Sequence, residues 1–425
     1  MTAPAPLAFL LDDHPLPAEA IHHARRFLLD LIGIGWGGSR TPLASIVAAH
    51  AREDLPGDVP LPFARGTASP MGAALAAGMT IDALDGHDGC NLTKGHAGCG
   101  LLAGLLAVAP DGMTMPAFLD HLARGYEVGT RMGIALHATA ADYHTSGAWI
   151  APTVAGLAAR VMGLDRAAPA HAVGIGEYHG PRSPMMRVID HPTMLKDGSG
   201  YGAMAGVQAA RLAARGFTGA PATLLDHPAF ADLGTRWMVA EQYLKPYPVC
   251  RWAQAPVEAA LFLRAAHGID GAEVEAVRVE SFHEATRLAT RDCRTTEEAQ
   301  YSTAFPVAVA LARGAVGPRD VTEGLDDPLV RRIAARLDFT EDAAANAAFP
   351  GTRLARVTVR TARGAWTSRW HRPRWDADAP PTDADLVAKM RDTVAGTPAD
   401  ADAVLHGVMG GGATTVAALR ALLRP

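Results

Sequence analysis

Apolar residues recur every three to four positions through most of the first 267 residues, which is the spacing of helices with one buried face. The longest helices that this spacing predicts cover residues 18–31, 71–79, 101–109, 115–136, 149–162 and 201–214. The glycine-rich stretch 33–38 is expected to end the first of them, because glycines favour breaks in a helix.

The pattern changes near Gly268. Residues 273–280 and 354–360 alternate between apolar and polar positions, as strands with one buried face do. Residues 366–370 are expected to pair with the second of these strands. Residues 327–337 are predicted to form a short helix.

Helical spacing returns at residues 383–394 and 416–423, after a stretch rich in proline and aspartate. The predicted fold class is therefore mainly α. We expect a large all-helical domain made of residues 1–267 and 382–425, with a smaller α/β domain inserted at residues 268–381.

The formal net charge of the 425 residues is −5, and 20% of them are charged. Without an excess of basic residues, nucleic acid is not expected as a partner. No apolar run reaches the length of a membrane span, so no membrane association is expected. The first 13 residues lack a basic segment ahead of their short apolar run, so we expect no signal peptide and a cytoplasmic location.

The four cysteines form no Cys-x-x-Cys pair and no zinc-ligand spacing. They are Cys90, Cys99, Cys250 and Cys293. Reduced, buried thiols are the expected state, and an iron–sulfur cluster held by three of them is the alternative. No metal or cofactor is predicted.

A polar, glycine-rich stretch at residues 84–100 lies between two apolar runs that predict buried helices. It contains Asp85, Asp88, Lys94 and His96, whose side chains suit acid–base chemistry. Polar loops held by a rigid scaffold commonly carry function. The alternative is a solvated connection whose glycines only serve the turn.

Only four of the 39 basic residues are lysines, at positions 94, 196, 245 and 389. A chain that otherwise uses arginine is expected to retain lysine where a compact ammonium with an adjustable pKa is needed. Three of the four lie in motif-like segments, and chance retention is the alternative explanation.

Several short motifs of the chain recur together in one known family. They are Lys196-Asp197-Gly198 with residues 202–206, Lys245-Pro246-Tyr247-Pro248 with Cys250-Arg251, Gly125-Tyr126-Glu127 with Arg131, and Gln300-Tyr301-Ser302. Over roughly residues 20–420 the chain resembles the MmgE/PrpD family, which includes 2-methylcitrate dehydratase, cis-aconitate decarboxylase and iminodisuccinate epimerase. The resemblance implies a large helical domain with a smaller α/β lid, a homodimer, and a small-molecule carboxylate as substrate.

The resemblance also implies roles for particular residues. The implied catalytic set is Asp85, His96, His144, Lys196 and Lys245. The implied substrate-binding set is Asp88, Tyr201, Tyr247 and Cys250. No metal ligand is among them.

The chain departs from the family pattern in several places. His96 is followed by Ala97 rather than proline, and the family's Asp-Asp-Thr run is missing from the loop. Cys250 stands where cis-aconitate decarboxylases carry a histidine, and Phe305 where they carry a tyrosine. The last two differences disfavour decarboxylation. The altered loop leaves open a family-like protein that only binds a carboxylate or a partner.

These residue types suit removal of a weakly acidic proton next to a carboxylate. Lys196 and Lys245 would stabilise the enolate-like intermediate, and His144 and His96 would serve as base and acid, in an order that the sequence leaves open. Asp85 would orient one imidazole. The predicted activity is metal-free dehydration of a 2-methylcitrate-like di- or tricarboxylic acid. Epimerisation of an iminodisuccinate-like acid and cis-aconitate-type decarboxylation remain alternatives, because they share the intermediate.

Overall fold

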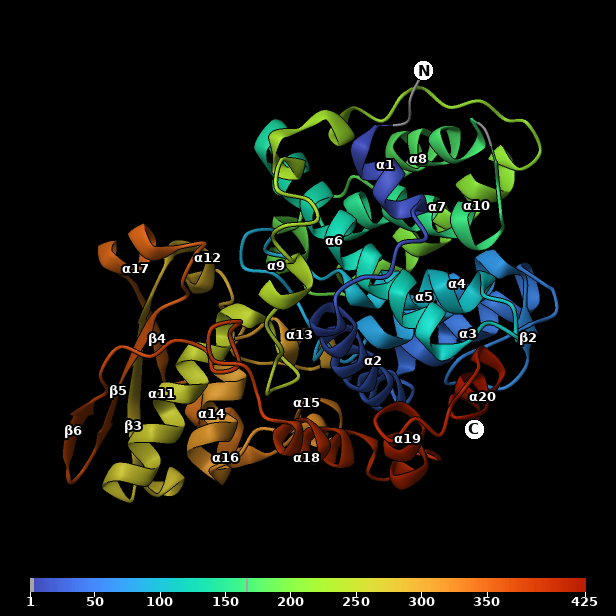
Figure 1. The fold of residues 1–425 in the computed structure, drawn as a ribbon. Coiled ribbons are helices and arrows are strands. Elements are labelled where there is room, and N and C mark those ends of the chain that lie inside the picture. Colours follow the sequence, from blue (N-terminus) through green and yellow to red (C-terminus); the bar gives the residue numbers. More distant parts are fainter. Residues whose placement is uncertain (1–3, 166) are drawn as a thin grey trace.

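The computed structural model describes residues 4–165 and 167–425, and most of them are helical (Figure 1). The helices up to residue 267 are α1 (Ala5–Leu11), α2 (Ala18–Gly38), α3 (Pro42–Asp54), α4 (Pro70–Asp82), α5 (Gly98–Val108), α6 (Met115–Thr139), α7 (Gly147–Val161), α8 (Ala168–His179), α9 (Met186–Asp190), α10 (Ser199–Ala213) and α11 (Arg251–His267). Short elements among them are β1 (Val59–Pro60), β2 (Thr67–Ala68), η1 (Thr223–Asp226), η2 (Pro228–Phe230) and η3 (Met238–Glu241). The predicted class, mainly α, is confirmed.

Helix α7 lies at the centre of this group and packs against α5, α6, α8 and α10. The backbones of α7 and α10 approach closely at Gly202, where a Cβ would lie 2.6 Å from the carbonyl oxygen of Gly147. Beside this contact, the Gly147 amide donates a hydrogen bond of 3.2 Å to the carbonyl oxygen of Asp197. The packing therefore fixes the Lys196–Gly198 turn against the first residues of α7.

Helix α2 does not end at its glycines, so the break expected at residues 33–38 is wrong. The helix continues unbroken to Gly38. A Cβ on Gly38 would lie 2.0 Å from the carbonyl oxygen of Thr80, and one on Gly35 would lie 2.3 Å from the ring of Phe63. These glycines let α4 and the Phe63 ring lie directly on the helix, and this tertiary packing outweighs the low helix propensity of glycine.

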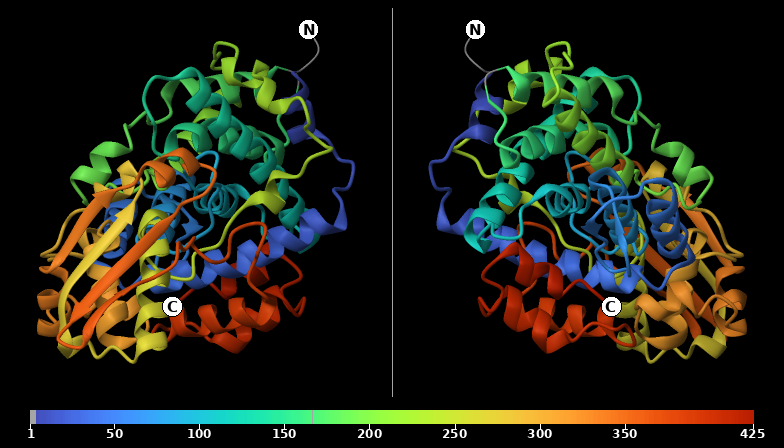
Figure 2. Two further views of the ribbon diagram at one scale, coloured as in Figure 1. Left: turned by 90° about the vertical axis from the view of Figure 1, so that its left-hand side faces the viewer. Right: turned by 90° about the vertical axis from the view of Figure 1, so that its right-hand side faces the viewer.

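The remaining elements include a four-stranded sheet. They are η4 (Gly271–Glu273), β3 (Val274–Ser281), α12 (His283–Thr286), α13 (Thr296–Gln300), α14 (Ala304–Arg313), α15 (Pro318–Thr322), α16 (Pro328–Ala334), β4 (Leu337–Glu341), α17 (Ala343–Ala348), β5 (Ala355–Thr361), β6 (Gly364–Thr367), α18 (Asp383–Val394), α19 (Ala401–Val408) and α20 (Val416–Ala421). The strand order is β4-β3-β5-β6, with β4 parallel to β3 and the other pairs antiparallel. Figure 2 shows this sheet as an outer layer, and α11 and α16 pack against it.

The sheet contains the predicted strands and one more. The strands expected at 273–280 and 354–360 correspond to β3 and β5. The strand that pairs with β5 is β6 at residues 364–367, so the pairing expected for residues 366–370 is found two residues earlier and ends at Thr367. The helix expected at 327–337 is shorter, because α16 ends at Ala334 and the chain enters β4 at Leu337. Leu337 pairs with Val277 of β3 and is buried there. Such a short run of residues becomes a strand because a partner strand is available.

The last helices return to the beginning of the chain. Helices α18 and α19 pack against α2 (Figure 1), and α11 packs against β5. The proposed boundaries after residues 267 and 381 stay a prediction. Within residues 4–165 and 167–425, none of the helices has both the length and the apolar character required to cross a membrane.

Candidate active site

The polar loop between α4 and α5 is held in place by the chain segment ahead of α11. The amide of Gly89 donates a hydrogen bond of 3.1 Å to the carbonyl oxygen of Tyr243, and the amide of Tyr243 donates one of 2.7 Å to Gly89. This two-bond pairing sets the segment 243–245 alongside the loop. Lys245 and Asp85, which are far apart in the sequence, thereby become neighbours.

Three residues around the site have unusual backbone conformations. Asp85, Lys94 and Lys196 have φ of 50°, 51° and 52°, in the left-handed region that non-glycine residues rarely adopt. Such conformations cost free energy and concentrate at functional sites, where the surrounding structure holds them. Local packing therefore fixes the direction in which these three side chains leave the backbone.

Two lysines, the buried Lys245 and the half-buried Lys389, hold consecutive residues of the loop. The Lys245 ammonium donates to the Asp85 carboxylate at 2.7 Å and to the Asp85 carbonyl oxygen at 3.0 Å. The Lys389 ammonium donates to the carbonyl oxygen of Gly86 at 2.7 Å and to the carboxylate of Asp30 at 2.6 Å. Each of these two cations therefore has a carboxylate partner.

Lys196 is also buried, and its partners are uncharged. Its ammonium donates a hydrogen bond to the side-chain oxygen of Gln300 and lies 4.7 Å from the ring centroid of Tyr301. The Gln300 amide in turn donates to the carbonyl oxygen of Ala83 at 3.0 Å. Lys196 is thus oriented by a residue that contacts the same loop. Among the described residues its ammonium forms no direct ion pair, although its charge acts on the buried Asp82 carboxylate.

His96 is a buried imidazole whose tautomer is fixed by its neighbours. Its Nδ1 lies 2.6 Å from the carbonyl oxygen of Asp88, so Nδ1 carries the proton and Nε2 has the free lone pair. Burial lowers the pKa of His96 well below its usual value, and the charges of Lys245 and His87 lower it further. A neutral imidazole with an available Nε2 is suited to accept a proton.

The main chain of His96 is connected to the turn that carries Lys196. The His96 amide donates to the Ser146 hydroxyl at 2.9 Å, and that hydroxyl donates to the carboxylate of Asp197. Burial and the nearby Asp82 carboxylate raise the pKa of Asp197 to about 7. Ser146 therefore couples the base candidate to the Lys196-Asp197 motif.

One small cavity, of ≈ 20 Å³, brings several of these groups together. Its lining residues are Asp85, Lys94, His96, Tyr143, Met185, Tyr243, Cys250, Arg251, Trp252, Tyr301 and Arg353. Asp85, His96 and Cys250 from the sequence-predicted sets are among them, Lys245 is bonded to Asp85, and Lys196 lies over Tyr301. Four of the five predicted catalytic residues are thus at or next to one cavity.

The fifth predicted catalytic residue, His144, does not line this cavity. It is half-buried, and its Nδ1 donates to the carbonyl oxygen of Asp142 at 2.7 Å. Its main chain pairs with Pro184, which orients the preceding residue, Tyr143, toward the cavity lining instead. The structure therefore does not bring His144 together with the other four.

The predicted substrate-binding residues are dispersed. Asp88 is buried, and its carboxylate accepts from the Gly98 amide at 3.1 Å. Tyr201 lies on α10 with 47% of its surface exposed. The Tyr247 hydroxyl donates to Glu258 at 2.9 Å. Of this set, Cys250 alone is in the cavity lining.

Lys94, Arg251 and Arg353 supply positive charge to the cavity. The sequence placed Lys94 in the polar loop without a catalytic or binding role, and it gave no role to the two arginines. The Lys94 ammonium lies 4.3 Å from the ring centroid of Tyr143, and Arg251 and Arg353 lie over Tyr243 at 4.1 and 6.0 Å. Arg251 was visible as part of the Cys250-Arg251 motif. Arg353 stands in a segment without any recognisable sequence signal.

The positive charge of the site is only partly balanced. Within the part of the chain that the structure describes, no carboxylate oxygen lies within 4.0 Å of the charged nitrogens of Lys94, Lys196 or Arg353. Lys196 and Arg353 are buried. A buried charge without a partner is strongly unfavourable, so this arrangement favours a bound anion.

One group of side chains has the composition of a metal site. Asp82, Asp85 and His87 are buried, and they offer ligand atoms within 4.8 Å of one another. The Lys245 ammonium already occupies one Asp85 oxygen, and two backbone amides, those of Asp197 and Ser199, donate to Asp82. A divalent cation there would lie next to the Lys245 ammonium, so the group fits a network that shares protons better than a ligand set for a metal.

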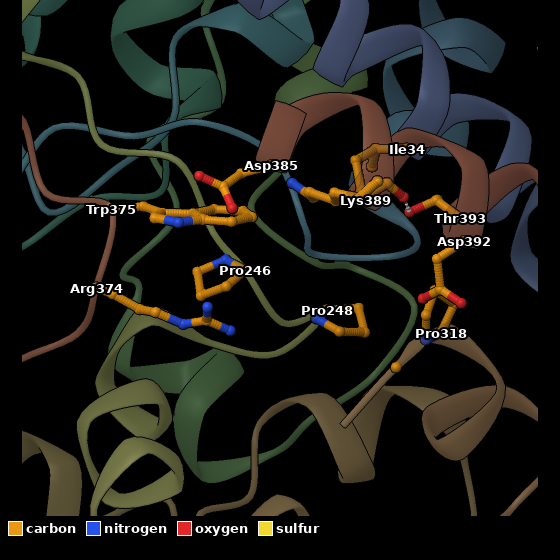
Figure 3. A pocket seen from close by; sticks show the side chains of 12 residues that line it. Ile34, Pro246, Pro248, Pro318, Arg374, Trp375, Asp385, Lys389, Asp392 and Thr393 are labelled. Atoms are coloured by element: carbon orange, nitrogen blue, oxygen red, sulfur yellow. Dashed lines mark hydrogen bonds between the residues drawn. The ribbon is translucent and has the colours of Figure 1, made fainter. Parts of the chain in front are cut away.

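A second cavity, of ≈ 270 Å³, lies on the other side of the Lys245–Pro248 segment. Figure 3 shows Pro246 and Pro248 facing Lys389, Asp392 and Thr393, with Arg374 and Trp375 beside the prolines. Its basic side chains have carboxylate partners, since Lys389 contacts Asp30 and Arg374 contacts Glu258. This cavity therefore lacks the unbalanced charge of the first.

Comparison with family models identifies the chain. Residues 11–237 match the MmgE/PrpD N-terminal domain, and residues 247–406 match the MmgE/PrpD C-terminal domain. No curated protein matches the chain. Asp85, His96 and Lys196 lie in the first matched segment, and Arg251 and Arg353 lie in the second. Because the two matches together cover most of its length, the chain belongs to the MmgE/PrpD family.

Proposed function

We propose that this protein is a lyase that dehydrates a 2-methylcitrate-like di- or tricarboxylic acid, with protein side chains as acid, base and charge stabiliser. Membership of the MmgE/PrpD family indicates a dehydratase-type or related activity. The observation that carries the finer proposal is the set of cations without carboxylate partners around one cavity: Lys94, Lys196 and Arg353. A substrate with several carboxylates would balance their charge.

His96 is the proposed base. Its Nε2 takes a proton from the carbon next to a substrate carboxylate, and the electron pair of that C–H bond forms the new double bond as the C–O bond on the neighbouring carbon breaks. Negative charge builds up on the carboxylate during this step. Lys196, which forms no direct ion pair among the described residues, stabilises that charge; one such group typically contributes ~10²–10³ in kcat.

The leaving hydroxide needs a proton. His144 lies outside the cavity lining, so we assign this role to the Lys245–Asp85 pair, in which Asp85 lines the cavity and Lys245 is bonded to it. The Lys245 ammonium gives a proton to the leaving oxygen and water forms. Asp85 stabilises the ammonium before the step and holds the neutral amine afterwards, until Lys245 takes up a proton again.

The cavity favours elimination over epimerisation. An epimerase that uses two bases needs a proton acceptor on each face of the substrate. His96 is the single imidazole among the described residues of the lining. Cys250 is a poor second base, because burial raises its pKa to about 12.

The test is incubation of the purified protein with 2-methylcitrate, citrate and related hydroxy acids, followed by ultraviolet absorbance for a new conjugated double bond. We expect turnover with at least one tricarboxylate and a loss of ~10²-fold or more for His96→Gln and Lys196→Met. Arg360→Met, a change on the exposed side of β5, is the matched control. Deuterium uptake from heavy water without new absorbance would indicate epimerisation instead of dehydration. Release of carbon dioxide would indicate decarboxylation.

A further inference from the structure

We propose that Arg353 binds a second carboxylate of the substrate, so that the ligand is a polycarboxylate held between Lys196 on the helical side and Arg353 on the side of the sheet. This inference rests on the proposed function and deepens it, because it adds a recognition residue that sequence motifs did not reveal. Arg353 lies between α17 and β5 and lines the cavity with Tyr301, the ring over which Lys196 lies.

Arg353 is buried, and among the described residues it has no carboxylate partner. It is 2% exposed. Its Nη1 donates to the side-chain oxygen of Asn91 and, at 3.1 Å, to the carbonyl oxygen of Pro350. Both acceptors are neutral. Its Nη2 donates to the carbonyl oxygen of Asn91 at 3.5 Å. Its Nε, like the Nε of Arg251, is buried and has no hydrogen-bond partner, so one donor of the guanidinium is free.

The neighbouring Arg251 provides an internal comparison. It is equally buried, at 2% exposed, and it lies over the same Tyr243 ring. Arg251, however, forms an ion pair of 2.5 Å with Asp376. Since burial and aromatic contact are shared, the missing carboxylate distinguishes Arg353 as the group left for a ligand. Guanidinium groups recognise carboxylates through two parallel N–H donors, and the free Nε can supply one of them.

The contacts of Arg353 also reach the catalytic loop. Asn91, its partner, lies in the same loop as Asp85 and His96, and its amide donates to Gly351 at 3.3 Å and to Asp376 at 3.2 Å. A carboxylate bound at Arg353 would therefore fix the segment 350–353 against the loop that carries the base. Substrate binding at Arg353 would thus also hold the loop in position.

The experiment measures binding rather than turnover, by calorimetry with tricarballylate, a tricarboxylate that has no hydroxyl group to eliminate. We expect Arg353→Met to weaken tricarballylate binding by ~30-fold or more, as loss of one charge-assisted contact does. Arg353→Lys keeps the charge and should weaken binding less. Arg360→Met is the control and should bind as the unmodified protein does. If Arg353→Met does not fold, Arg353→Lys with a ligand series of three, two and one carboxylates provides the same comparison.

The outcomes separate the two proposals. If Arg353→Met and Arg353→Lys bind tricarballylate as tightly as the unmodified protein while Lys196→Met does not, the Arg353 inference is overturned and the proposed function stands. If the unmodified protein binds no polycarboxylate at all, both are overturned. The loss of affinity caused by Arg353→Met can also be compared between ligands. A smaller loss for a dicarboxylate than for tricarballylate supports the assignment of the second carboxylate to Arg353.

Discussion

His87 lies edge-on against His96, with their ring centroids 4.7 Å apart and their planes at 84°. Both imidazoles approach the carbonyl oxygen of Asp88 through Nδ1, at 3.4 Å from His87 and 2.6 Å from His96. The Nε2 of His87 lies 3.4 Å from the carboxylate of Asp82. His87 occupies the part of the loop that departs from the family pattern. Its imidazole packs against that of the proposed base, His96.

We predict that His87→Gln shifts the acid limb of the kcat/KM profile to higher pH. Burial lowers the pKa of His87, but the Asp82 carboxylate outweighs it and the net pKa is raised. A charged His87 lowers the pKa of His96, so removing that charge raises it, and His96 becomes protonated, and inactive as a base, at a higher pH. The measurement is the pH profile together with the ¹⁵N chemical shift of His96.

The control for this prediction is a variant of Asp82, the charged partner of His87. Lys245, Asp88 and Asp30 also interact with the His87–Asp82 pair or with its neighbours. Asp82→Asn should move the His96 titration in the same direction as His87→Gln, because an uncharged Asp82 no longer favours the charged form of His87. An unchanged His96 titration in both variants would contradict the coupling.

We predict that Lys245→Met destabilises the fold more than the double variant Lys245→Met with Asp85→Asn. The single change leaves the Asp85 carboxylate buried and unpaired, and breaking a buried pair in this way costs about 3–5 kcal/mol. The double change removes both charges. Denaturant unfolding of the single and double variants measures the difference, and equal stability of the two would show that the pair is exposed to water in solution.

We predict that Asp197→Asn flattens the pH dependence of stability between about pH 4 and pH 7. The pKa of Asp197 is raised to about 7 in the folded protein from 3.8. The folded state therefore binds this proton more tightly than the unfolded state, and its stabilising contribution is lost as the pH rises through 7. The free energy of unfolding of the unmodified protein should fall over this range relative to that of the asparagine variant.

We predict that Gly38→Ala destabilises the protein by about 2 kcal/mol or more, although alanine is the better helix former. The added Cβ would lie 2.0 Å from the Thr80 carbonyl oxygen, so α2 and α4 would have to separate. Gly112→Ala is the matched control, since a Cβ there meets nothing within 4 Å. Thermal or denaturant unfolding measures both; equal values would contradict the packing described for α2.

The local pattern of residues predicted much of the fold. Helical spacing gave α6, α7, α10 and α18 close to their observed bounds, and alternation gave β3 and β5. It was wrong for α2, whose glycines look like a break in sequence and serve as a contact surface in the structure. It also missed β4, because five residues become a strand only beside an existing partner.

The chemistry of the site divides in the same way. The sequence by itself determined the helical class and the family, and it proposed the side chains Asp85, His96, Lys196 and Lys245, because motifs and scarce lysines are local features of the chain. Only the tertiary structure decided which charges are balanced. Lys389 meets Asp30 and Arg251 meets Asp376, whereas Arg353 meets no carboxylate among the described residues. These partners are more than a hundred residues apart, and the energy of a buried charge depends on distance in space, which residue spacing does not give.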